Sequence, residues 1–338
     1  MDRVCASTDA DGRAAIAVAD IPAPAGDLFQ PIDESAQSLA PRTFTGSIES
    51  DWRVTSFSWL TSEQRTRTES PDHDPDELTR GEDTQAEGIF AFPRGSKAGT
   101  CIHKILEDFE LQNPDGAALL NCIQKHFAAH GIGNEHAAPL ATAIRHTLSA
   151  PLAAGGSFCL NEVPTSSRRT ELEFCFALNP IDRSVLTRMF SSLELPDWAT
   201  GWPERVGRLS FSPTRGFLKG FIDLICEVDG RYYLIDWKSN WLGPELKDYH
   251  PNVIQREMVS KYYVLQYHLY TVALHRHLEL RLPNYDFARH FGGVRYLFLR
   301  GINPAAPGHG IFSVCPTAEQ ITLLARTLLA PPGTSLQQ

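Results

Sequence analysis

Two aspartates and one lysine in the second half of the chain have the types and spacing that suit metal-dependent hydrolysis. Asp223 lies in the run GFID, and Asp236 and Lys238 lie in the run LIDWKSN. A lone carboxylate in an apolar strand is costly, so we expect a divalent cation beside these two aspartates. Such an ion neutralises a phosphate and lowers the pKa of a bound water, and a lysine stabilises the developing charge. The pattern therefore predicts phosphodiester hydrolysis.

The D-x-K spacing alone is equally typical of an ion pair at the end of a strand. Further residues could take part in such a site, although a strand glutamate is as often simply exposed. Glu171 or Glu173, which share a strand face by alternation, offers a third carboxylate. His103 precedes Glu107 by one helical turn, so the two face the same way. A helical histidine of this kind is often structural, however.

Gln266 and Tyr270 are four residues apart on a predicted helix, on a face offset from its apolar stripe. Two roles are open for them. They can pack and hydrogen-bond within the protein, or they can contact phosphates.

The elements that must position these residues follow from periodicity. Asp229 and Gly230 separate two apolar runs and predict a tight hairpin, which brings Asp223 close to Asp236. A helix after the hairpin then crosses to another strand, which indicates a mixed α/β domain. The expected strands are 52–60, 171–178, 217–228, 232–237 and 294–299, and the expected helical segments are 97–111, 115–153, 253–277 and 317–329.

Charge is unevenly distributed along the 338 residues. The formal net charge is −9. Residues 1–90 hold 18 acidic and 7 basic side chains, whereas residues 91–338 hold 22 acidic and 24 basic side chains. We predict that residues 1–89 are an acidic, largely disordered leader with a short docking segment near 51–60, and that residues 90–338 form the folded domain. The near-neutral remainder is compatible with binding to phosphates.

Seven scattered cysteines include no CxxC pair, which argues against a zinc ribbon or a disulfide framework and favours reduced thiols. The sequence also has no apolar run of about 18 residues. We therefore expect a cytoplasmic protein that does not enter a membrane.

Several segments together resemble the C-terminal nuclease domain of RecB-type helicase–nucleases, the beta subunits of exodeoxyribonuclease V, in the PD-(D/E)XK superfamily. The matching stretches are GTCIHKILEDFE (99–110), ELEF (171–174), GFLKGFIDLICEVDGRYYLIDWKSNWLG (216–243), YVLQYHLYTVALHRHL (263–278) and HFGGVRYLFLRG (290–301). The resemblance implies a restriction-endonuclease-like α/β core, a central mixed sheet flanked by helices. It places a helical insertion between the first helix and the Glu171 strand.

The resemblance also implies roles for individual residues. Lys238 would be the catalytic lysine and Glu171 the first acidic residue of the motif. Gln266 and Tyr270 match the QxxxY motif of the family. The metal ligands would be His103, Asp223, Asp236 and the backbone carbonyl of Trp237. The ion would be Mg²⁺, with Mn²⁺ as a substitute and Ca²⁺ binding without supporting catalysis.

The implied function is exonuclease-type cleavage of DNA in recombination and repair, together with RecC-like and RecD-like subunits and a RecA-type recombinase. The chain holds no GxxxxGK[ST] motif, so we expect no ATP hydrolysis from it. Two alternatives are kept. One is a non-catalytic module that docks a RecC-like subunit or a recombinase, and the other is a free-standing nuclease that acts on DNA ends.

Overall fold

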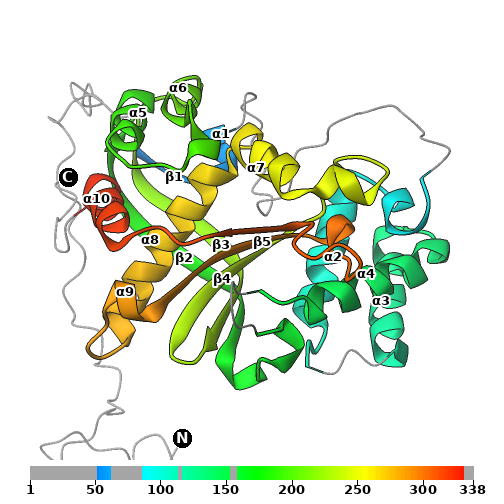
Figure 1. Cartoon of the computed structure of the whole chain (residues 1–338). Helices are drawn as coiled ribbons and strands as arrows, with labels where there is room; N and C mark the ends of the chain where they lie inside the picture. The colour runs from blue at the N-terminus through cyan, green and yellow to red at the C-terminus, as the bar shows by residue number, and fades with distance from the viewer. Residues whose placement is uncertain (1–51, 62–85, 113–115, 153–157, 331–338) are drawn as a thin grey trace, which may run out of the picture. The chain divides into compact units, whose positions relative to one another are not determined.

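The computed structural model describes residues 52–61, 86–112, 116–152 and 158–330, and a mixed six-stranded sheet organises them (Figure 1). The strands are β1 (Trp52–Thr55), β2 (Arg168–Ile181), β3 (Thr214–Val228), β4 (Arg231–Lys238), β5 (Phe291–Phe298) and β6 (Ile311–Val314). β3 pairs with β1, β2 and β4, and the sheet continues from β4 through β5 to β6. The predicted mixed α/β class is confirmed.

The predicted hairpin joins β3 and β4. Asp229 and Gly230 both have positive φ, 52° and 74°, which is what a two-residue type I′ turn requires. The turn sets the register, in which Val228 lies opposite Arg231 and Leu224 lies opposite Ile235. This register carries Asp223 and Asp236 to the same end of the hairpin, as the sequence predicted.

Helices cover both faces of the sheet. Alternate residues of β4 point to two separate cores: Leu234 joins the core that packs on α8, whereas Ile235 and Trp237 join the core that packs on α2 and α4. The helices are α1 (Phe57–Thr61), α2 (Ser96–Asp108), α3 (Gly116–His130), α4 (Ala137–Ser149), α5 (Arg183–Ser191), α6 (Trp202–Val206), α7 (Pro251–Ser260), α8 (Tyr263–Arg281), α9 (Phe287–His290) and α10 (Ala318–Leu328). The predicted helical insertion corresponds to α3 and α4.

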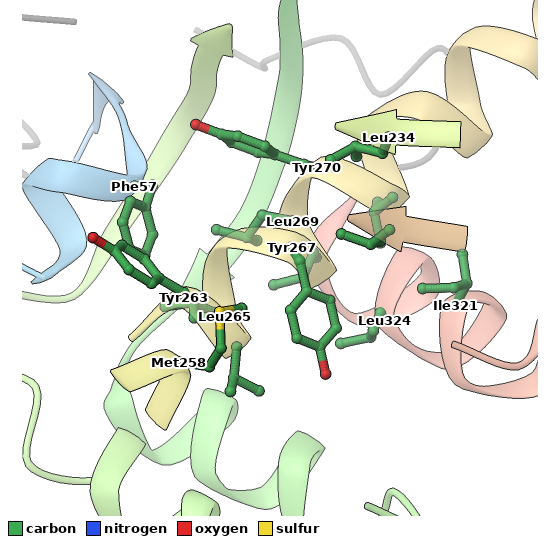
Figure 2. Packing of buried hydrophobic residues seen from close by; sticks show 14 of the residues in the cluster. Phe57, Leu234, Met258, Tyr263, Leu265, Tyr267, Leu269, Tyr270, Ile321 and Leu324 are labelled. Atoms are coloured by element: carbon green, nitrogen blue, oxygen red, sulfur yellow. The ribbon is translucent and has the colours of Figure 1, made fainter. Parts of the chain in front are cut away.

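The helix α8 is the central packing element on its face. Its residues Leu265 and Leu269 meet Phe57 of α1, Leu234 of β4 and Leu324 of α10 in one core (Figure 2). Together α7 and α8 form the crossover between β4 and β5, which pair in parallel. Within the described residues, no helix is both long and apolar enough to cross a membrane.

Two predicted elements differ from the structure. The strand expected over 52–60 ends at Thr55, because the hydroxyl of Ser56 accepts the N–H of Trp59 at 3.2 Å and starts α1. The single helix expected over 253–277 is two helices, because Tyr262 between them has a φ of 59° and interrupts the helical backbone.

Most of the predicted leader, 1–89, lies outside the described residues. Its described part includes β1, which pairs in parallel with the start of β3, Trp52 opposite Arg215. Four short elements, α5, α6, α9 and β6, were not anticipated. Elements of this length are stabilised by tertiary packing rather than by their own propensity, so periodicity reveals them poorly.

Buried His268 of α8 is expected to make the fold acid-sensitive. Burial lowers the pKa of its imidazole from 6.5 to about 4, and its Nδ1–H donates to the carbonyl of Val264. Below pH 6.5 the unfolded chain binds a proton that the folded chain takes up only near pH 4. The free energy of unfolding should therefore fall by on the order of 3 kcal/mol between these pH values.

Chemical denaturation as a function of pH, beside a His268→Gln variant that cannot titrate, measures this contribution. The variant should show a shallower loss of unfolding free energy between pH 6.5 and 4. Equal pH slopes for the two proteins would contradict the assignment.

Candidate active site

The backbone ladder between β3 and β4 stops where the functional side chains begin. The last backbone pair of the hairpin on this side is Leu224 with Ile235. Beyond it, the N–H of Trp237 donates to Oδ2 of Asp223 at 2.8 Å, so a side chain takes the place of a strand carbonyl. This hydrogen bond satisfies a buried donor and fixes the direction of the Asp223 carboxylate.

Three residues from three elements converge beside this point. His103 of α2, Glu171 of β2 and Asp223 of β3 each offer one ligand atom, and these atoms all lie within 4.8 Å of one another. Nδ1 of His103 is 3.5 Å from Oδ1 of Asp223. An imidazole nitrogen with carboxylate oxygens is a donor set that divalent first-row ions and, through its oxygens, Mg²⁺ accept. The residues present therefore fit a divalent metal ion.

Glu171 reaches this cluster through an unusual backbone conformation. Its φ is 48°, a sparsely populated region for a residue with a long side chain, in the interior of a strand. Strain of this kind persists where the surrounding structure over-determines it, which is common at functional sites. Glu173 instead points to an exposed ion pair with Lys219 at 2.9 Å. Of the two glutamates that the sequence left open, the structure brings Glu171 to the cluster.

Asp236 and Lys238 occupy the end of β4 and are almost fully buried, at 2% and 4% exposure. Their side chains form an ion pair at 2.9 Å, which confirms that they share a strand face. Burial and, to a lesser extent, the charge of Asp223 raise the pKa of Asp236 to about 7, against the lowering effect of Lys238. Near neutral pH a further positive charge beside Asp236 would therefore favour the ionised form of this carboxyl.

Asp223 is held in the opposite state. Burial acts to raise its pKa, but the charge and hydrogen bond of His103, the charge of Lys238 and the N–H of Trp237 together bring the pKa below its ordinary value. Burial acts to lower the pKa of His103, but the charge and hydrogen bond of Asp223, with the charge of Asp236, raise it above its ordinary value. The site thus contains one stabilised carboxylate beside carboxyls whose pKa values are raised. Such divergence is characteristic of functional sites.

The ammonium of Lys238 is enclosed by two tyrosines that the sequence analysis did not single out. Its Nζ lies 4.1 Å from the ring centroid of Tyr263 and 5.3 Å from that of Tyr296. The negative faces of aromatic rings favour a cation at these distances. Tyr263 opens α8 and Tyr296 lies opposite Asp236 on β5, so tertiary pairing alone brings them to the lysine.

Gln266 and Tyr270 lie behind these tyrosines and are buried, at 1% and 2% exposure. The amide of Gln266 donates to the Tyr270 hydroxyl at 3.2 Å and accepts from the Tyr296 hydroxyl at 2.9 Å. Of the two roles left open by the sequence, this arrangement favours internal hydrogen bonding, because buried side chains offer no surface to a phosphate.

The chain was compared with known proteins. A family model described as "PD-(D/E)XK nuclease superfamily" matches residues 77–320. RecBCD enzyme subunit RecB of Escherichia coli (strain K12) is 34% identical over 309 residues, which cover 88% of this chain and 25% of that protein. The corresponding subunit of Mycolicibacterium smegmatis is 30% identical over 337 residues, covering 88% of this chain and 31% of that protein. The chain thus spans about a quarter to a third of these relatives, and the predicted resemblance is confirmed.

Glu171 is expected to destabilise the metal-free fold at alkaline pH. Burial, and next the charge of Asp223, raise its pKa from 4.5 to about 7. Between these pH values the folded chain holds a proton that the unfolded chain releases, so stability falls as pH rises through the window. Because the carboxyl is only partly shielded from solvent, we expect a loss of about 1–2 kcal/mol.

Thermal unfolding in EDTA at pH 8 tests this expectation. Glu171→Gln should unfold at a higher temperature than the parent chain, and the difference should shrink toward pH 4.5. Glu173→Gln, which removes an exposed strand carboxylate, is the matched control and should show no such gain. A Glu171→Gln variant that is less stable at pH 8 would refute the expectation.

Proposed function

The chain belongs to the PD-(D/E)XK nuclease superfamily, and we propose on this premise that it is a metal-dependent deoxyribonuclease of the RecBCD type. The mixed sheet flanked by helices is the fold of this superfamily, as predicted. The observation that carries the proposal is the convergence of His103, Glu171 and Asp223 beside the buried pair of Asp236 and Lys238. A protein that merely docks a partner has no need to bury such a set of charges.

The proposed metal ligands are His103, Asp223, Asp236 and the backbone carbonyl of Trp237. The ion is Mg²⁺, with Mn²⁺ as a substitute and Ca²⁺ binding without supporting catalysis. When bound, such an ion neutralises phosphate charge and eases deprotonation of the attacking water. The carboxylates of Asp223 and Asp236 provide the negative charge that holds it, and the contact of His103 with Asp223 keeps the imidazole aimed at the same point.

Lys238 is proposed to orient the attacking water and to stabilise the charge that develops on the phosphate oxygens. Its position suits this role, because Asp236 and the rings of Tyr263 and Tyr296 restrict the ammonium to one place. A group that is fixed before the reaction needs no reorganisation during it. Glu171 is proposed to supply the third carboxylate, at the rim of the cluster.

The proposed biological setting follows from the relatives, whose names describe subunits of a RecBCD enzyme. We propose that the chain acts on DNA in recombination and repair, as an exonuclease, with RecC-like and RecD-like subunits and a RecA-type recombinase as partners. We place it in the cytoplasm. Residues 90–338 would form the nuclease domain, and the chain's own residues would not hydrolyse ATP, since they include no GxxxxGK[ST] motif.

We expect the purified chain to degrade linear DNA when Mg²⁺ is present and to stop when EDTA is added. Asp236→Ala should abolish the activity, because the metal loses a buried ligand. Single-stranded, double-stranded linear and circular substrates, each followed by gel electrophoresis, make the measurement. Glu173→Gln, an exposed acidic residue of β2, is the matched control and should be fully active.

Degradation that persists in Asp236→Ala would place the chemistry elsewhere. A parent chain that binds Mg²⁺ and yet cleaves none of these substrates would favour the non-catalytic docking module instead. Cleavage of circular DNA as readily as linear DNA would contradict the exonuclease part of the proposal.

Lys238→Met should lower the rate of cleavage by on the order of 10²–10⁴-fold, because the variant keeps the bulk of the side chain but loses its charge. Single-turnover cleavage gives the rate, and calorimetric titration with Mn²⁺ tests whether the metal still binds. Lys219→Met, on the exposed face of β3, is the matched control. A loss of less than tenfold, with Mn²⁺ saturating the site, would remove Lys238 from the chemistry.

A further inference from the structure

Arg300 is a buried cation that the chemistry above does not use. It lies in a 3₁₀ turn, η7 (Leu299–Gly301), directly after β5, and is 2% exposed. Within the described part of the chain it has no carboxylate partner at ion-pair distance. Burial lowers the pKa of its guanidinium to about 10, so the group remains charged at neutral pH. A buried charge without a counter-ion must be held by dipoles.

Backbone carbonyls from two separate segments supply these dipoles. One is the carbonyl of Ser239, which accepts from Nε at 2.8 Å and directly follows Lys238. The others belong to the segment that leads into α2, which includes the 3₁₀ turn η1 (Gly88–Ala91). Nη1 donates to the carbonyls of Ile89 at 3.0 Å and Phe92 at 2.9 Å, and Nη2 donates to that of Pro93 at 2.7 Å. One guanidinium therefore joins the entry of α2 to the end of β4.

We call the boundary between the entry of α2 (residues 88–103) and the end of β4 (residues 236–241) the seam, and two further close approaches occur along it. A Cβ added to Gly99, in α2, would lie 3.1 Å from Oγ of Ser239, so an alanine here would need a shift of a few tenths of an ångström between the helix and Ser239. The guanidinium of Arg94, just before α2, lies 3.5 Å from the ring centroid of Trp241, just after β4. The entry of α2 and the end of β4 thus approach each other closely at these two points as well as at Arg300.

The site residues lie on the two elements that this seam joins. His103 is one helical turn beyond Gly99 on α2, and Asp236 and Lys238 end β4 immediately before Ser239. The contact between His103 and Asp223 is the point at which α2 reaches the site. The placement of His103 therefore depends on how α2 is anchored to the sheet.

We propose that Arg300 is a positioning residue for the metal site, and that by binding carbonyls on both sides of the seam it fixes α2 on the end of β4 and sets His103 against the carboxylates. The metal part of this proposal rests on the proposed function. The planar five-donor fork of arginine suits the task, because it serves four carbonyls in divergent directions at once. A lysine keeps the charge but presents one compact ammonium, which leaves buried carbonyls unsatisfied.

Arg300→Lys in the full chain, beside Arg295→Lys, tests the proposal. Arg295 is the matched control: it is also a buried arginine that donates to backbone carbonyls, those of Leu152 and Val294, but it lies away from the seam. Mn²⁺ affinity by calorimetry and amide hydrogen exchange of residues 88–103 are the two readouts. Arg300→Lys should weaken Mn²⁺ binding by about 10–100-fold and speed exchange in that segment. Arg295→Lys should do neither, even if it lowers the melting temperature equally.

A double-mutant cycle with His103→Ala separates positioning from general destabilisation. If Arg300 acts through His103, Arg300→Lys should weaken Mn²⁺ binding no further in the His103→Ala chain. If the losses of Mn²⁺ affinity caused by Arg300→Lys and His103→Ala simply add in the double variant, the proposal is overturned. Unchanged Mn²⁺ affinity together with unchanged hydrogen exchange in Arg300→Lys would also overturn it. A parent chain that does not bind Mn²⁺ would refute the proposed function, and exchange in residues 88–103 would then decide the anchoring by itself.

A second variant covers the case in which Arg300→Lys does not fold. Gly99→Ala inserts a methyl group against Ser239, and it should weaken Mn²⁺ binding several-fold by moving α2 away from β4. Ser239→Ala in the same chain removes the opposing hydroxyl and should restore the affinity. Failure of either change to affect Mn²⁺ affinity would mean that the seam does not control the site.

Discussion

The burial of Asp236 close to Asp223 is the constraint around which the rest of the structure is arranged. A carboxylate moved from water into a protein interior loses several kcal/mol of solvation, and a second one nearby adds repulsion. Lys238, His103 and the N–H of Trp237 offset part of this free energy. These groups come from α2 and from the end of β4, and Asp223 lies on β3, so the site exists only when α2 and the β3–β4 hairpin are both in place.

The sequence predicts those parts of the fold whose signals are local. The Asp229-Gly230 turn needs two positive φ values, few residue types adopt them, and the turn in turn dictates the strand register. Residues two apart in a strand point to the same face, so the ion pair of Asp236 and Lys238 agrees with their spacing. The relative positions of Asp223, Asp236 and Lys238 in the candidate site could be predicted from the sequence for this reason.

Other features were not accessible, because they depend on contacts between distant segments. Alternation could not separate Glu171 from Glu173, since the positive φ of Glu171 is imposed by its surroundings and not by residue type. The same applies to Tyr262, whose φ of 59° divides a helix that its apolar stripe presents as continuous. In both cases a residue with a large side chain adopts a positive φ, a conformation that glycine adopts most readily. Tertiary packing can enforce this conformation, but local propensity cannot predict it.

The buried amide of Gln266 links the packing of α8 to the end of β4 that carries Lys238. Its oxygen accepts from the Tyr296 hydroxyl, which holds that ring beside Lys238, and its nitrogen donates to Tyr270 one turn further along the helix. A polar side chain at this depth is stable when its hydrogen bonds are made, and then it specifies one arrangement of its neighbours. An apolar residue of similar size would fill the space but would leave the orientation of Tyr296 undetermined. Gln266 and the α8 core thus fix the rings of Tyr263 and Tyr296, and these rings in turn fix the position of the Lys238 ammonium group.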